Sequence, residues 1–280
     1  MQEKTLALGD GFGGLELGYL EWGAADAGRT VVCVHGLTRN AHDFDTLAAA
    51  LADLGCRVLA VDVAGRGRSG WLADPMQYDL AVYAGHLSAL LQRLGLARID
   101  WVGTSMGGLI GMLLAAQEGS PVERLVINDI GPKVARETLG HIRSYLGLDL
   151  QFRDLGELEA HLRLIHAPFG PLSDAQWRAL AEHSARRAPE GLRLHYDPAI
   201  REAFAAAADT DTDLWAVWDR IACPVLVIRG ADSALLTGDI LAEMRARKPA
   251  IEVATFQGIG HAPALMDPAQ IAAVTRWLDL

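Results

Sequence analysis

The segment RIDWVGTSMGGLIGMLLAAQEG, residues 98–119, carries the signals that decide the fold. A short strand-like run at 98–102 leads into the pentapeptide GTSMG at 103–107, and an apolar, helix-like run follows. This order predicts a strand, a sharp turn and a helix, with glycines on both sides of Ser105 to avoid collisions in a strained turn. The turn would raise the Ser105 hydroxyl above the sheet, beside free N–H groups that favour a developing negative charge. We therefore expect Ser105 to be a nucleophile.

Strand-like runs alternate with helical patterns on both sides of this segment. Several runs are apolar almost throughout, which is typical of parallel strands covered by helices on both faces. The sequence thus predicts an α/β fold with a mostly parallel sheet, opened by an antiparallel hairpin around residues 16–23. The predicted strands are Thr30–His35, Arg57–Asp62, Arg98–Val102, Arg124–Asn128, Pro224–Arg229 and Ile251–Phe256. The predicted helices are 43–54, 79–94, 106–118 and one that begins at Asp267-Pro268.

The alternation stops between residues 132 and 220. That stretch has helical patterns and loops but no convincing strand, and the sheet pattern then resumes. The simplest account is one core domain of residues 1–131 and 221–280, with an inserted helical cap, or lid, of residues 132–220.

Composition excludes several classes of function. The formal net charge of the 280 residues is -10, which opposes binding to nucleic acid. Cys33, Cys56 and Cys223 are an odd number and lie far apart, so neither a disulfide framework nor a zinc site is expected. No apolar run approaches the roughly 18 residues that span a bilayer. We expect a cytoplasmic protein without nucleic-acid or membrane partners, and the sequence carries no signal for its oligomeric state.

A histidine near the far end of the chain is the candidate general base. His261 lies in GIGHAP, residues 258–263, directly after the last predicted strand. A histidine in such a loop can reach Ser105 and take its proton, provided that the loop holds one tautomer of the ring.

The turn that ends the first central strand is the candidate oxyanion site. His35-Gly36 there can aim the N–H of Leu37 at the same point as the N–H of Met106, and two such donors are what acyl transfer requires. The side chain of His35 is expected to be structural. Arg39 follows closely and is a candidate for contact with a substrate.

With these features the sequence resembles the α/β-hydrolase superfamily over nearly its whole length. The order Ser…acid…His and the turn DVAGRGRS at 62–69 carry the resemblance, the turn being similar to the family's D-x-x-G-x-G-x-S. The subgroup with the most similar pattern contains esterases and meta-cleavage-product hydrolases with a helical cap, and NDIGP at 128–132 precedes the insertion.

The resemblance implies a serine hydrolase that cleaves a small or medium carboxylic ester or lactone through an acyl-enzyme. Two alternatives stay open: hydrolysis of a carbon–carbon bond in a vinylogous 1,5-diketone, and a non-catalytic, ligand-binding member of the fold. No cofactor and no metal are expected. The glycines at 65, 67 and 70 formally match a dinucleotide fingerprint, but a loop follows them where a helix is required.

The acid of the triad is where the sequence departs from the family. Relatives place it in the loop after the strand that corresponds to 224–229, often written G-x-x-S-D-x-L. Here the loop reads GADSALL, residues 230–236, with Ala234 at the expected position. Three accounts remain open: the acid has been lost or replaced, leaving a catalytically weakened enzyme; Asp129 serves instead; or Asp232 reaches the histidine. A lost acid predicts that Ala234→Asp raises ester turnover by orders of magnitude.

The substrate cavity is expected to lie under the cap. The candidate substrate-binding residues are Arg39, Trp215 and Trp218. Large aromatic side chains of a cap can form the wall of an apolar cavity, and the candidates for such walls are Phe152, Phe169, Trp177, Phe204, Trp215 and Trp218.

Overall fold

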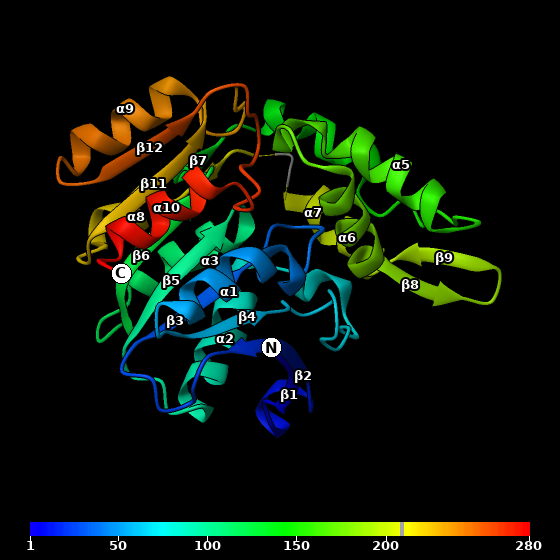
Figure 1. The fold of residues 1–280 in the computed structure, drawn as a ribbon, viewed down its shortest axis with the longest axis horizontal. Coiled ribbons are helices and arrows are strands. Elements are labelled where there is room, and N and C mark those ends of the chain that lie inside the picture. Colours follow the sequence, from blue (N-terminus) through cyan, green and yellow to red (C-terminus); the bar gives the residue numbers. More distant parts are fainter. Residues whose placement is uncertain (208–209) are drawn as a thin grey trace.

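The computed structural model describes residues 1–207 and 210–280, and its centre is an eight-stranded sheet (Figure 1). The strand order is β1-β2-β4-β3-β5-β6-β11-β12; β1 and β2 pair antiparallel, β2 and β4 do too, and every other pairing is parallel. This confirms the predicted fold class. The strands are β1 Gln2–Ala7, β2 Glu16–Trp22, β3 Thr30–Val34, β4 Arg57–Val61, β5 Ile99–Thr104, β6 Val122–Asn128, β11 Val225–Gly230 and β12 Glu252–Phe256.

Helices cover both faces of this sheet because side chains alternate along each strand. In β3, Val32 and Val34 join one apolar cluster, with α2, α3 and α9, whereas Val31 and Cys33 join a second cluster, with α1 and α10. The core helices are α1 Asp45–Asp53, α2 Leu80–Arg93, α3 Met106–Ala115, α9 Gly238–Arg247 and α10 Pro268–Trp277. Short 3-10 helices at Asp10–Phe12, Ala41–Phe44 (η2) and Pro75–Gln77 supplement them.

Residues 132–220, called the cap segment below, connect β6 to β11, and residues 155–194 of this segment lie to one side of the sheet (Figure 1). It contains helices α4 Gly140–Tyr145, α5 Leu155–Ile165, α6 Asp174–Ser184, α7 Ile200–Ala207 and α8 Trp215–Arg220, with 3-10 helices at Arg136–Leu139 and Ala167–Phe169. Buried side chains of α5 and α6, among them Leu158, Leu162 and Trp177, form a separate apolar cluster.

The expectation that this segment has no strand was wrong. A hairpin of β8 Ala185–Ala188 and β9 Gly191–Leu194 extends from α6, and β7 Lys133–Val134 pairs with β10 Thr212–Asp213. The hairpin was missed because its strands consist of alanine, arginine, glycine and leucine, which have little intrinsic preference for a sheet.

Candidate active site

Ser105 occupies the sharp turn between β5 and α3. Its φ of 52° and ψ of -113° form the strained backbone expected at this position. The flanking glycines are required by space: a Cβ on Gly103 would lie 2.2 Å from the carbonyl oxygen of Gly107, and one on Gly107 would lie 2.0 Å from that of Val34. Close backbone contact thus explains the glycines of the motif. The turn that they permit places the Ser105 side chain above the carboxyl edge of the sheet.

His261 connects Ser105 to a carboxylate. Its Nε2 lies 2.8 Å from Ser105 Oγ, and its Nδ1 lies 2.9 Å from Asp129 Oδ2. Because a carboxylate accepts the Nδ1 proton, Nε2 is left as an acceptor that faces the serine hydroxyl. The three residues come from the carboxyl ends of β5 and β6 and from the loop after β12, which meet at one edge of the sheet.

Asp129 is fully buried and held from three sides. Its backbone N–H donates to Ile228 O at 2.8 Å, and its Oδ1 accepts the N–H of Gly230 at 2.8 Å. Its φ of 59° is left-handed, a region that aspartate enters more readily than most residues. The second oxygen therefore faces His261 in a fixed position.

The loop in which relatives carry the acid, residues 230–236, contributes no side chain to the contact between Asp129 and His261. Ala234 and Asp232 are both exposed and line the neighbouring cavity, and the N–H of Asp232 donates to Ile259 O at 2.9 Å. Among the three accounts of the acid, the structure brings Asp129 to His261, whereas the carboxylate of Asp232 makes no hydrogen bond with that ring within the described part of the chain.

Asn128 is a site residue that the sequence reasoning missed. Its Nδ2 donates to Thr104 Oγ1 at 3.0 Å and to Pro263 O at 2.8 Å. A single buried amide thus ties the strand before Ser105 to the loop that carries His261. The signal available in the sequence was the NDIGP motif, which was interpreted only as the boundary of the insertion.

The peptide between Gly36 and Leu37 is oriented by its carbonyl oxygen. Gly36 O accepts from the Nδ1 of His35 at 2.7 Å and from the N–H of Arg39 at 3.1 Å. In a trans peptide the N–H points away from the C=O, so that of Leu37 faces the other way. Among the described residues, neither this N–H nor that of Met106 has an acceptor. Both remain available to an oxyanion.

His35 is held as one neutral tautomer. Its Nε2 accepts the N–H of Val63 at 3.0 Å, so its Nδ1 carries the proton that is donated to Gly36. Burial lowers the pKa of His35 to about 3, since the charged ring would be desolvated.

This buried histidine predicts a loss of stability in acid. Between the folded pKa of about 3 and an unfolded value near 6.5, the unfolded chain binds a proton that the folded chain does not. The free energy of unfolding therefore falls as the pH falls, by about 2 kcal/mol from His35 alone between pH 6.5 and 5. Urea unfolding of the parent and of His35→Gln at pH 7 and pH 5 measures this loss. We expect a smaller loss in the variant; equal losses would contradict the assignment.

The guanidinium of Arg66 contacts both candidate oxyanion residues, Leu37 and Met106. Its Nε donates to Leu37 O at 2.9 Å, Nη1 donates to Tyr83 OH at 2.6 Å, and Nη2 lies 3.7 Å from Met106 Sδ. The side chain is fully buried. Sequence reasoning assigned it no role, although it lies within the DVAGRGRS turn.

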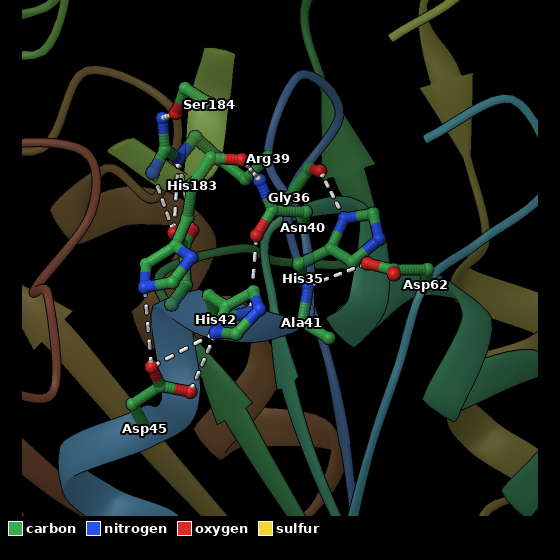
Figure 2. A network of polar contacts seen from close by, with 11 residues as sticks. His35, Gly36, Arg39, Asn40, Ala41, His42, Asp45, Asp62, His183 and Ser184 are labelled. Carbon is green, nitrogen blue, oxygen red and sulfur yellow. Dashed lines mark hydrogen bonds and ion pairs between the residues drawn. The ribbon is translucent and has the colours of Figure 1, made fainter. Parts of the chain in front are cut away.

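The cap segment contacts the core at the loop that carries Leu37, as Figure 2 shows. Arg39 Nη1 donates to Ser184 Oγ at 2.9 Å, and Asn40 Nδ2 donates to His183 O at 3.0 Å. Arg39 also pairs with Asp43 through Nε and Nη2. The C-terminal end of α6 is thereby fixed beside the candidate oxyanion site.

A cluster of His42, Asp45 and His183 lies near this contact (Figure 2). Their potential ligand atoms lie within 4.8 Å of one another. The two rings, however, are stacked face to face, with centroids 3.6 Å apart and 8° between their planes. Nitrogen lone pairs lie in the ring planes, so those of stacked rings run parallel and do not converge on one ion. This arrangement does not by itself make a metal site.

Two cavities meet at Ser105. The first, of about 370 Å³, is lined by His261 and Arg39 and is called the histidine arm. The second, of about 440 Å³, is lined by Met106 and is called the methionine arm. Both arms share Leu37, Ser105, Ile142 and Leu235.

Of the six candidate aromatic walls, the structure brings Phe169 and Phe204 to the cavities, but not the two tryptophans chosen as substrate-binding residues. Trp218 is fully buried, and Trp215 packs against the main core with Arg247 over its ring. Neither lines an arm within the described residues; Phe169 lines the histidine arm and Phe204 the methionine arm. Residue type indicated aromatic walls, but only the packing of α8 against α3 decided which side chains were available.

A doubly covered sheet with a serine, a histidine and an aspartate at its carboxyl edge is the arrangement typical of serine hydrolases of the α/β type. Residues 29–268 match the sequence model of the alpha/beta hydrolase fold family. The chain therefore belongs to the α/β-hydrolase family and is an enzyme of the hydrolase class. This confirms the resemblance seen in the sequence.

Particular relatives cover nearly the whole chain. It is 44% identical, over 93% of its length and 92% of the relative, to a 3-hydroxybutyrate-oligomer hydrolase of Cupriavidus necator. A solved hydrolase from Rickettsia typhi is similar at a TM-score of 0.93 and 32% identity, covering 100% of this chain and 99% of that one. A solved α/β hydrolase from Novosphingobium aromaticivorans is similar at a TM-score of 0.87 and 35% identity, and the match covers 99% of this chain and 98% of that one. No helix in residues 1–207 and 210–280 combines the length and apolarity that a membrane crossing requires.

Proposed function

We propose that the chain hydrolyses carboxylic esters through an acyl-enzyme formed on Ser105. Ser105 Oγ attacks the carbonyl carbon while its proton passes to His261 Nε2, and the carbonyl oxygen becomes an oxyanion held by the N–H groups of Leu37 and Met106. The imidazolium then gives the proton to the departing alcohol oxygen. Water, activated by the same histidine, attacks the acyl carbon and releases the acid.

Asp129 is the acid of this mechanism. It holds the His261 tautomer that can accept the serine proton, and it stabilises the imidazolium formed at each step. The observation that carries the proposal is the continuous hydrogen-bond chain from Ser105 Oγ through His261 to Asp129, with distances of 2.8 and 2.9 Å.

The proposed substrates are small or medium esters of hydroxy acids, short oligoesters among them. This class is supported by the 44% identity to a relative named as a 3-hydroxybutyrate-oligomer hydrolase and by apolar cavities on both sides of Ser105. Lactones offer the same carbonyl chemistry. Hydrolysis of a carbon–carbon bond in a vinylogous 1,5-diketone requires the same serine and histidine, and no contact on these residues favours it.

A panel of purified substrates tests the proposal. p-Nitrophenyl esters of increasing acyl length, linear 3-hydroxybutyrate dimer and trimer, and a vinylogous 1,5-diketone are offered to the folded chain, and a fluorophosphonate is used to label it. We expect ester and oligoester turnover, with the label on the peptide that contains Ser105. Turnover of the diketone alone would replace the proposal by carbon–carbon hydrolysis, and no turnover of any ester would refute it.

A further inference from the structure

The two arms differ in whether they border His261, the residue that gives a proton to the leaving group. In the tetrahedral intermediate the carbon on Ser105 carries an oxyanion, a departing alcohol oxygen and the acyl chain. The departing oxygen must lie beside His261 Nε2 to receive its proton. His261 lines the histidine arm and is absent from the described lining of the methionine arm. The alcohol half of the ester therefore extends into the histidine arm, which leaves the methionine arm for the acyl half.

The charged groups of the arms discriminate between the same two halves. In a linear oligoester of hydroxy acids, the free carboxylate belongs to the alcohol half of its last ester bond, because that hydroxyl is the esterified group. A buried carboxylate needs N–H donors, best supplied by a guanidinium. Each arm is lined by two aspartates among its described residues, Asp43 and Asp232 in the histidine arm and Asp79 and Asp211 in the methionine arm, but only the histidine arm also has an arginine.

The histidine arm contains Arg39, whose side chain is 5% exposed. Its hydrogen bonds to described residues use Nε, one hydrogen of Nη1 and one of Nη2, toward Asp43 and Ser184. An arginine has five N–H donors, so each terminal nitrogen keeps one hydrogen without an acceptor among the described residues. The Asp43 pair fixes the guanidinium, and the remaining donors are available to a substrate oxygen.

We propose that a hydroxy-acid oligoester binds in one direction, with its carboxylate end in the histidine arm at Arg39 and its hydroxyl end in the methionine arm. This inference rests on the proposed function, because it assumes that Ser105 attacks an ester. The arms have similar volumes, about 370 and 440 Å³, so the site favours esters that are extended on both sides of the scissile bond.

The first experiment measures how strongly the enzyme prefers a free carboxylate. It compares kcat/KM for 3-hydroxybutyrate dimer with that for its methyl ester, in the parent, Arg39→Gln and Arg39→Lys. We expect the acid-to-ester ratio to fall about 10- to 100-fold in Arg39→Gln, mainly through KM, and to be partly restored in Arg39→Lys. Because the ratio is internal to each variant, partial loss of folded protein does not change it.

Ser184→Ala is the matched control for this experiment. It removes the cap contact of Arg39 but leaves the guanidinium and Asp43 in place. We expect it to keep the parent ratio. A parent ratio in Arg39→Gln, or an equal fall in Ser184→Ala, would overturn the role of Arg39.

The second experiment tests direction with two matched truncations. Phe204→Ala enlarges the methionine arm and Phe169→Ala the histidine arm, and both side chains are only partly buried. We expect Phe204→Ala to shift the preferred acyl length upward at constant alcohol, and Phe169→Ala to shift the preferred alcohol size at constant acyl group. Exchanged effects would overturn the direction of binding while leaving ester hydrolysis intact. A parent enzyme inactive on all esters would remove the proposed function itself.

Discussion

Replacing Asp129 by asparagine is expected to lower kcat/KM for any ester substrate by about 10⁴-fold. Oδ1 of Asp129 accepts the N–H of Gly230, so the oxygen of an asparagine would stay there and its NH₂ would face His261. That NH₂ can only donate, which would leave the Nδ1 of His261 without its proton and put a proton on Nε2. The ring could then no longer accept from Ser105. Steady-state kinetics together with circular dichroism measure the effect in a folded variant.

The neighbouring loop provides the controls. Asp232→Asn and Ala234→Asp alter the two positions that compete for the same role, and in the described part of the chain the carboxylate bonded to His261 belongs to Asp129. We expect both to stay within about tenfold of the parent, since the carboxylate position is already filled. A large gain in Ala234→Asp, as a lost acid predicts, would show that Asp129 does not perform the function proposed for it.

Ser105→Ala is expected to remove about 10⁶-fold of kcat, because the acyl-enzyme can no longer form. The activity that remains would come from substrate binding and from the N–H groups of Leu37 and Met106, which the change leaves in place. The fluorophosphonate label should be lost completely. Ser120→Ala, in a turn remote from both arms, is the control and should keep both turnover and label. If the Ser105→Ala variant still reacted with the fluorophosphonate, the nucleophile would have to be another residue.

Most of the sheet could be predicted from the sequence because its central strands are buried on both faces. The predicted strands differ from β3, β4, β5, β6, β11 and β12 by only one or two residues at their ends. The turn at Ser105 could also be predicted from the sequence. Close backbone contact permits only glycine at 103 and 107, so the two glycines indicate the turn directly.

The carboxylate that contacts His261 could not be predicted from local sequence patterns. Local spacing directs attention to residues 230–236, but which carboxylate touches His261 depends on the order β5-β6-β11 across the sheet. Asp129 becomes a neighbour of Gly230 only when β6 pairs with β11. Arg66 and Asn128 were missed for the same reason, since their partners lie up to 135 residues away in the chain.

Asp129 directly follows a central strand of the sheet, and this position affects how the protein can change. In the proposed mechanism, a carboxylate fixed at the end of β6 leaves the side chains of Asp232 and Ala234 without a catalytic role, although both border the histidine arm. Substitutions of these two exposed side chains can change the space for an alcohol while the backbone bond from Asp232 N–H to Ile259 O, in the loop of His261, stays in place. These two exposed positions are therefore the natural place for a laboratory library, or for evolution, to diversify which molecules are accepted.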